Sequence, residues 1–109
     1  MPTLDQLLES DLRVGTVVTA RPHTSARNPA LQLKIDFGSI GVKQSSAQIT
    51  KRCGCDELVG RQVIAVVNLP ARRIAGFRSD VLVLGVMLPN EDVVLLTPDA
   101  NVPDGARIG

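Results

Sequence analysis

The residues of this chain that could support acid–base or metal chemistry are few and poorly placed for it. His23 is the single histidine, in a loop with no nucleophile or carboxylate at a spacing that indicates a catalytic pair. Cys53 and Cys55 are separated by one residue, and no second Cys or His pair exists to complete a four-ligand zinc site. Phosphate-loop, nucleophile-elbow and zinc-protease motifs are absent. We therefore expect no enzymatic activity, no metal and no cofactor, with both thiols free.

The basic residues form a different kind of candidate site, because they are concentrated in the middle of the chain. The net charge is only +1, yet residues 13–78 carry eleven Lys and Arg against three acidic residues. Residues 1–12 and 79–109 together carry eight acidic residues against one base. Nine of the twelve bases are Arg, the side chain suited to bidentate phosphate contacts. This asymmetry is typical of a surface that binds a polyanion, unless the acidic ends fold over the basic middle.

Two segments combine bases with hydrogen-bonding side chains. One is the polar stretch from Lys43 to Arg52, and the other is a basic loop from Asn68 to Ser79. Such segments suit contacts to the phosphates and sugar hydroxyls of folded RNA, although an ordinary solvated face has the same composition. Aromatic residues are scarce, with Phe37, Phe77 and no Tyr or Trp. Base stacking needs exposed aromatic faces, so RNA recognition is expected to follow charge and shape.

The elements that must position these residues are mostly strands. Apolar and polar residues alternate most clearly over residues 31–37, with Leu31, Leu33, Ile35 and Phe37 on the side predicted to face the core. Gly15 indicates a bulge or a sharp bend in the first strand. Further strands are predicted over residues 11–20, 42–49, 62–67, 80–88 and 93–96, a helical turn over 56–59, and an extended, irregular tail.

An apolar stripe near the N-terminus predicts a short helix over residues 4–9. Thr3 to Gln6 fit a capping box, and the stripe consists of Leu4, Leu7 and Leu8. These residues, with the aliphatic stretches 81–88 and 93–96, exceed what one small barrel can enclose. The surplus predicts a homodimer interface or an apolar peptide-binding groove.

Together these elements predict an all-β fold: a small five-stranded Greek-key barrel of the OB type, with a short N-terminal helix and flanking extended segments. The 109 residues suffice for a single domain spanning 1–109. No apolar run reaches the ~20 residues that a bilayer helix needs, and no secretory signal is evident. We therefore expect a cytoplasmic location and no membrane partner.

Several stretches also resemble the tRNA-binding OB-fold domain family, which occurs alone or appended to aminoacyl-tRNA synthetases. Two longer stretches, Val42–Arg52 and Gln62–Asn68, are similar to its CsaA-type branch of bacterial export-related chaperones. One departure is that Ser79-Asp80-Val81-Leu82 replaces the Ser-x-Gly-Met step common in the wider family. The shorter matching stretches are Asp11–Gly15, Ile35–Gly38, Leu58–Val63, Asn68–Pro70 and Gly76–Ser79.

The resemblance implies a homodimer that binds tRNA and, for this branch, unfolded or exported polypeptides. The alternative is a peptide-binding export chaperone with only vestigial RNA binding, and a mere interaction module of a larger assembly is a third possibility. Leu4, Leu7 and Leu8 are expected at the peptide-binding or dimer surface. The residues expected to bind RNA are Lys43, Gln44, Ser46, Gln48, Lys51, Asn68, Arg72, Arg73, Arg78 and Ser79.

Overall fold

A computed structural model describes residues 9–22, 30–48, 55–74 and 76–109. The predicted helix over 4–9, apart from Glu9, and the residues His23, Lys51 and Cys53 lie outside these ranges. No helix among the described residues is long and apolar enough to cross a membrane. The elements are β1 (Leu12–Pro22), β2 (Leu31–Asp36), η1 (Gly38–Ile40), β3 (Val42–Ala47), α2 (Cys55–Leu58), β4 (Gln62–Val66), β5 (Arg72–Ile74), β6 (Phe77–Ser79), β7 (Leu82–Val83), β8 (Gly85–Met87), η2 (Pro89–Glu91) and β9 (Val93–Leu95).

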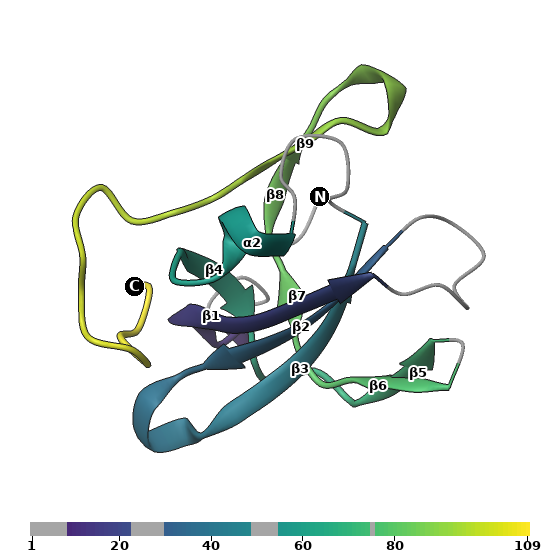
Figure 1. Cartoon of the computed structure of the whole chain (residues 1–109). Helices are drawn as coiled ribbons and strands as arrows, with labels where there is room; N and C mark the ends of the chain where they lie inside the picture. Colours follow the sequence, from purple (N-terminus) through teal and green to yellow (C-terminus); the bar gives the residue numbers. More distant parts are fainter. Residues whose placement is uncertain (1–8, 23–29, 49–54, 75) are drawn as a thin grey trace.

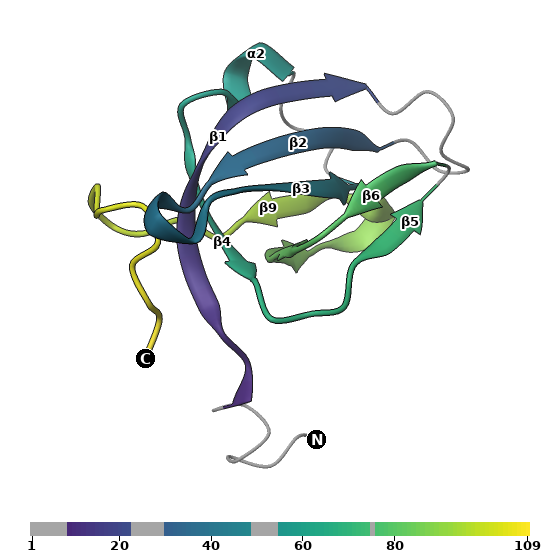
Figure 2. The same cartoon turned by 90° about the horizontal axis from the view of Figure 1, so that it is seen from below.

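Five strands curve into a nearly closed antiparallel barrel, which confirms the expected all-β, OB-type fold (Figures 1 and 2). Their order is β3-β2-β1-β4-β7. The closing seam joins β3 to the chain entering β7, where the amides of Asp80 and Val81 donate to the Gln44 carbonyl at 2.8 and 3.3 Å. The Ser46 amide donates to Ser79 Oγ across the same seam at 3.1 Å.

The core follows the predicted alternation. Leu31, Leu33, Ile35 and Phe37 are all buried, while Lys34 between them is exposed. Inward residues of β1 and β4, such as Val63, complete the interior with Leu58 of α2. This burial removes apolar side chains from water on one face of each strand and leaves the polar face of β2 outward.

The irregularity in β1 lies at Val18, three residues after the predicted position. Val17 pairs with Ile35 and Thr19 with Lys34, so Val18 is an extra, exposed residue opposite no partner. Gly15 has a different role: a Cβ atom there would lie 2.6 Å from Ile35 Cγ2 and 2.8 Å from the Phe37 ring. Glycine at this position lets the core side chains of β2 pack against the β1 backbone.

The segment expected to be a basic loop, residues 68–79, contains a β-hairpin instead. β5 and β6 pair in the order Arg72↔Ser79, Arg73↔Arg78 and Ile74↔Phe77. The long strand predicted over 80–88 is divided at Leu84. β7 pairs with β4, whereas β8 leaves the barrel and pairs with β9.

The C-terminal tail has no long strand but is fastened to the first half of β1. Val14 donates its amide to the Ala106 carbonyl and accepts from the Gly105 amide, at 3.0 and 2.7 Å. The Thr16 hydroxyl donates to Asp104 Oδ1 at 2.6 Å. These bonds fill the edge that β1 presents before its pairing with β2 begins at Thr16.

We expect Gly105→Ala to weaken the attachment of the C-terminal tail to β1 strongly. Gly105 has φ +88°, and an added Cβ would lie 2.4 Å from the Phe37 carbonyl oxygen. Gly60 has φ +90° with nothing within 4 Å, so Gly60→Ala is the matched control. Gly60→Ala should cost about 1–2 kcal/mol for the left-handed backbone, and Gly105→Ala about 1–3 kcal/mol more for the collision.

Urea unfolding followed by far-ultraviolet circular dichroism measures this difference. If only the tail detaches, the hydrogen exchange of the Gly105 and Val14 amides will accelerate while the unfolding midpoint changes little. Equal midpoints and equal exchange in the two variants would contradict the tight packing of the tail on Phe37.

Candidate nucleic-acid interface

Two rows of polar side chains cross the outer face of the barrel. Opposed residues of an antiparallel pair point to the same face, and the pairing of β1, β2 and β3 aligns them directly. The next residues along β2 and β3, Leu33 and Ser45, are buried, so both rows point outward. The first row is Thr19, Lys34 and Gln44, and the second is Arg21, Gln32 and Ser46.

The bulge at Val18 is what brings β1 into these rows. Strict alternation from the buried Val17 would turn Thr19 and Arg21 inward. The extra residue shifts the phase, so Ala20 packs toward the core and its two neighbours face solvent. A one-residue irregularity thereby adds an arginine to the outer face.

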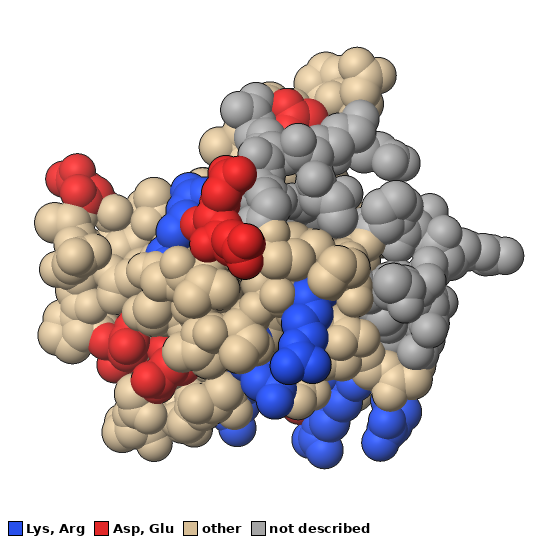
Figure 3. All heavy atoms as spheres, in the orientation of Figure 1, with Lys and Arg blue, Asp and Glu red and all other residues tan. Residues whose placement is uncertain are grey.

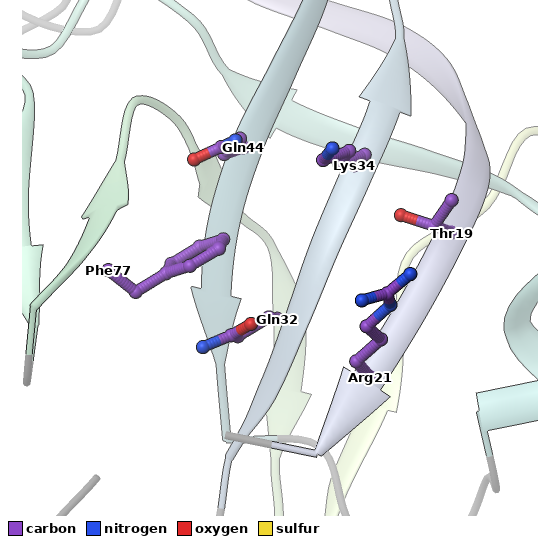
Figure 4. A pocket seen from close by; sticks show the side chains of 6 residues that line it. All are labelled: Thr19, Arg21, Gln32, Lys34, Gln44 and Phe77. Carbon is purple, nitrogen blue, oxygen red and sulfur yellow. The ribbon is translucent and has the colours of Figure 1, made fainter. Parts of the chain in front are cut away.

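A hollow of about 280 Å³ lies over the two rows (Figure 4). Its floor and one wall come from β1, β2 and β3, and its other wall is Phe77 of β6. Ser46 is not part of it. The lining residues are Thr19, Arg21, Gln32, Lys34, Gln44 and Phe77.

The two bases in this hollow are available to a ligand. Arg21 and Lys34 are exposed, and neither pairs with a carboxylate of the described residues. In Figure 3, Lys and Arg side chains gather over the region of β2, β3 and the β5–β6 hairpin, while most carboxylates seen in this view lie toward the opposite side. The carboxylates of the described residues therefore do not cover the basic face in this view. Such a face attracts phosphates.

The hairpin presents its arginines on two sides. Ser79 and Phe77 face the barrel, and Arg72 shares their side because it pairs with Ser79. Arg73 and Arg78 lie on the opposite side, exposed to solvent. Each of these two already has a partner: Arg73 Nη1 donates to the Gly76 carbonyl at 3.3 Å, and Arg78 Nε donates to Asp80 Oδ1 at 2.7 Å.

Asp80, which follows Ser79 at the closing seam, has a structural role. Its Oδ2 accepts from the backbone amide of Gln44 at 3.2 Å, while its Oδ1 forms an ion pair with Arg78. The carboxylate therefore stabilises the closing seam and offsets one basic charge of the hairpin.

Two residues predicted to bind RNA have their side chains occupied within the protein. The side-chain Oδ1 of Asn68 accepts from the backbone amide of Asp11 at 2.9 Å, and its Nδ2 donates to the Glu9 carbonyl at 2.7 Å. Ser79 Oγ accepts from Ser46 and its hydroxyl donates to the Val81 carbonyl at 3.4 Å. Ser79 therefore fastens the hairpin to β3 beside the basic face, whereas Asn68 holds residues 9 and 11 at the start of β1.

The remaining predicted residues are divided between faces. Gln44 lies in the hollow, and Lys43 pairs with Ile35, in register with the inner face at one end of the barrel. Gln48 lines a different, more apolar hollow. Lys51 and the stripe Leu4, Leu7 and Leu8 lie outside the described residues.

Sequence reasoning did not select several of the residues that line the hollow. The alternation over 31–37 marks Gln32 and Lys34 as outward, so this pattern could have identified them. Thr19 and Arg21 depend on the bulge, which no local sequence signal marks. Phe77 depends on the hairpin, for which the glycine at position 76 was an available signal.

A second surface, beside the closing seam, is apolar. A hollow of about 260 Å³ there includes Leu69, Pro70, Val81 and Leu82, bordered by Arg72. Another of about 260 Å³ follows it along β7 and β8 and includes Met87. We call these two hollows the apolar surface.

No group of three potential metal ligands occurs among the described residues, where Cys55 is a free thiol.

Known proteins share both the sequence and the fold. Residues 12–107 match the family model "Putative tRNA binding domain". The methionine–tRNA ligase of Methanothrix thermoacetophila is 41% identical over 95% of this chain, which spans only 15% of that enzyme's length.

Two solved structures extend over the whole chain. The chaperone CsaA of Bacillus anthracis is 51% identical with a TM-score of 0.95, covering 100% of this chain and 99% of its own. CsaA of Picrophilus torridus is 45% identical with a TM-score of 0.92 and covers 100% of both chains. With the family model, these matches confirm the resemblance found in the sequence. The chain belongs to the tRNA-binding domain family, in its CsaA-type branch.

Proposed function

We propose that this protein binds tRNA on the outer face of β1, β2 and β3 together with the β5–β6 hairpin. The observation that carries the proposal is the pair of exposed bases, Arg21 and Lys34, in a hollow lined otherwise by Thr, Gln and Phe side chains. Membership of the tRNA-binding domain family supports it. In this proposal the chain has no catalytic role and acts in the cytoplasm as one domain spanning residues 1–109.

Phosphates and sugars are the groups this face suits. Arg21 can donate two parallel hydrogen bonds to a phosphate, and Lys34 adds a compact positive charge. The amides of Gln32 and Gln44 can each donate and accept, so they suit ribose hydroxyls and base edges. Arg72 and Arg73, exposed on the hairpin, extend the positive surface beyond the hollow.

We expect Arg21→Gln combined with Lys34→Gln to weaken tRNA binding and its salt dependence together. Removal of one phosphate contact should reduce the log–log slope of affinity against salt by about 0.7 to 0.9. Fluorescence anisotropy with a labelled tRNA at several salt concentrations measures both quantities.

The matched control is Lys43→Gln combined with Arg107→Gln, which removes the same charge from the other face of β3 and from the tail. If both double variants lose affinity equally, net charge alone governs binding and the site is misplaced.

We further propose that the protein is a homodimer through the β8–β9 hairpin, which projects from the barrel. β8 and its surroundings expose Val86, Met87 and Leu88, with Met87 75% exposed. Contiguous exposed apolar residues mark interaction sites in soluble proteins. The surplus of aliphatic residues noted in the sequence is located in part here.

Val86→Asp combined with Met87→Asp should convert the dimer to a monomer, because buried unpaired carboxylates in an interface are costly. Sedimentation velocity measures the mass. Val42→Asp, at a 56% exposed valine of β3, is the control and should leave the dimer intact. A wild-type protein that sediments as 11.6 kDa would contradict the dimer.

A second candidate function is the binding of unfolded polypeptides, as a chaperone. The hollow that includes Leu69, Pro70 and Leu82 favours it, because its apolar lining offers contacts to aliphatic side chains. The two similar CsaA structures are described as chaperones. Should peptide binding be found without tRNA binding, the chain is an export chaperone with only vestigial RNA binding.

Leu82→Asp should reduce the protection of an aggregating client protein, measured by light scattering, at both low and high salt. Leu82 is 52% exposed, so the change is expected to leave the core intact. Val59→Asp, at a valine that is 48% exposed and lies outside the apolar surface, is the control. Unchanged protection by the Leu82 variant would remove this hollow from the peptide site.

A further inference from the structure

Phe77 places an aromatic ring in the basic hollow, which the scarcity of aromatic residues in the sequence did not predict. The chain has only two phenylalanines, and Phe37 is fully buried in the core. Phe77 is half-buried and lines the basic hollow, where its ring lies over β3 beside Gln32 and Gln44 (Figure 4). One aromatic ring is therefore placed among the groups proposed to contact phosphates and sugars.

The backbone that carries the ring is anchored within the hairpin and against β3. Within the hairpin, Phe77 pairs with Ile74, and two residues later Ser79 is bonded to Ser46 of β3. The Asp80 amide, bonded to Gln44, continues this attachment. Because this backbone is already ordered, a ligand that packs against the ring does not have to order the hairpin first.

The hollow has the composition of a site for one nucleotide. It offers an aromatic surface, two amides that donate and accept, and two cations, Lys34 on β2 and Arg21 on β1. Its volume, about 280 Å³, is at the lower limit of about 300 Å³ for small-molecule sites. A base within a duplex is stacked on both sides and cannot contact such a ring, whereas an unpaired base can.

We propose that this hollow holds a single unpaired nucleotide of the RNA, with its base against Phe77 and its phosphate between Arg21 and Lys34. This deepens the tRNA-binding proposal and rests on it. Gln32 and Gln44 can reverse their amide orientation, so they accept any base. The site therefore distinguishes an unpaired nucleotide from a paired one and is tolerant of sequence.

The aromatic content of the chain allows a direct spectroscopic test. With ¹³C-labelled phenylalanine, only Phe37 and Phe77 give ring signals. On titration with the tetranucleotide rA4, the Phe77 signals should move upfield because a stacked purine shields them, while the Phe37 signals stay constant. Phe77 signals that stay in place while rA4 binds would overturn the proposal.

A binding experiment tests the same site through its selectivity. The probes are one RNA hairpin with a blunt end and the same hairpin with a four-adenosine 3′ tail. Wild type should bind the tailed hairpin about tenfold more tightly, the gain expected from one stacked base. Phe77→Leu should abolish this preference and retain binding to the blunt hairpin, and Phe77→Tyr should preserve the preference.

The outcomes separate this inference from the proposed function. Equal affinity of wild type for both hairpins, or a preference that survives Phe77→Leu, overturns the nucleotide site while tRNA binding stands. Failure of the blunt hairpin and tRNA to bind, with the tailed hairpin still bound, overturns the tRNA proposal and leaves the nucleotide site. Unchanged amide protection of β3 in Phe77→Leu verifies that the variant keeps the seam.

Discussion

The closing seam between β3 and residues 79–81 is the interaction on which the rest of this structure depends. Backbone bonds from Asp80 and Val81 to Gln44 complete the barrel, and the bond from Ser46 to Ser79 fastens the hairpin against it. The same few contacts thus enclose the core and fix the aromatic wall of the basic hollow. Asp80 adds a carboxylate bond to this seam. These bonds therefore stabilise the barrel at the border of the proposed RNA-binding face.

The seam also separates two chemically different surfaces. On one side lie the cations and amides of β1, β2 and β3, and on the other lies the apolar surface around Leu82. The hairpin contributes to both, since Phe77 faces the first and Arg72 borders the second. In the functions proposed above, a polyanion and an aliphatic peptide segment would therefore occupy separate hollows on one small barrel. Their closeness means that a large occupant of either hollow would contact the hairpin that they share.

The strands were predictable where one face is uniformly buried. Leu31 to Phe37 alternate without interruption, so β2 and its outward residues follow from the sequence. The hairpin was missed because arginines and small residues in 71–79 are typical of loops, and their pairing depends on docking against β3. The bulge at Val18 was expected at Gly15 because glycine is the local signal, whereas the extra residue is decided by pairing with β2. Arg21, whose orientation depends on the bulge, could not be located from sequence alone, whereas the glycine at position 76 was a signal for the hairpin that places Phe77.

The attachment of the tail to β1 has a consequence for synthesis of the protein. Residues 104–108 complete the edge of a strand that begins at Leu12, so contacts about ninety residues apart must form. Pairings of such long range are late and slow, since loop-closure entropy opposes them. During synthesis on the ribosome, the edge of β1 that the tail covers therefore stays unpaired until residue 108 has left the exit tunnel. During that interval the nascent chain itself presents an unpaired strand edge to the surroundings.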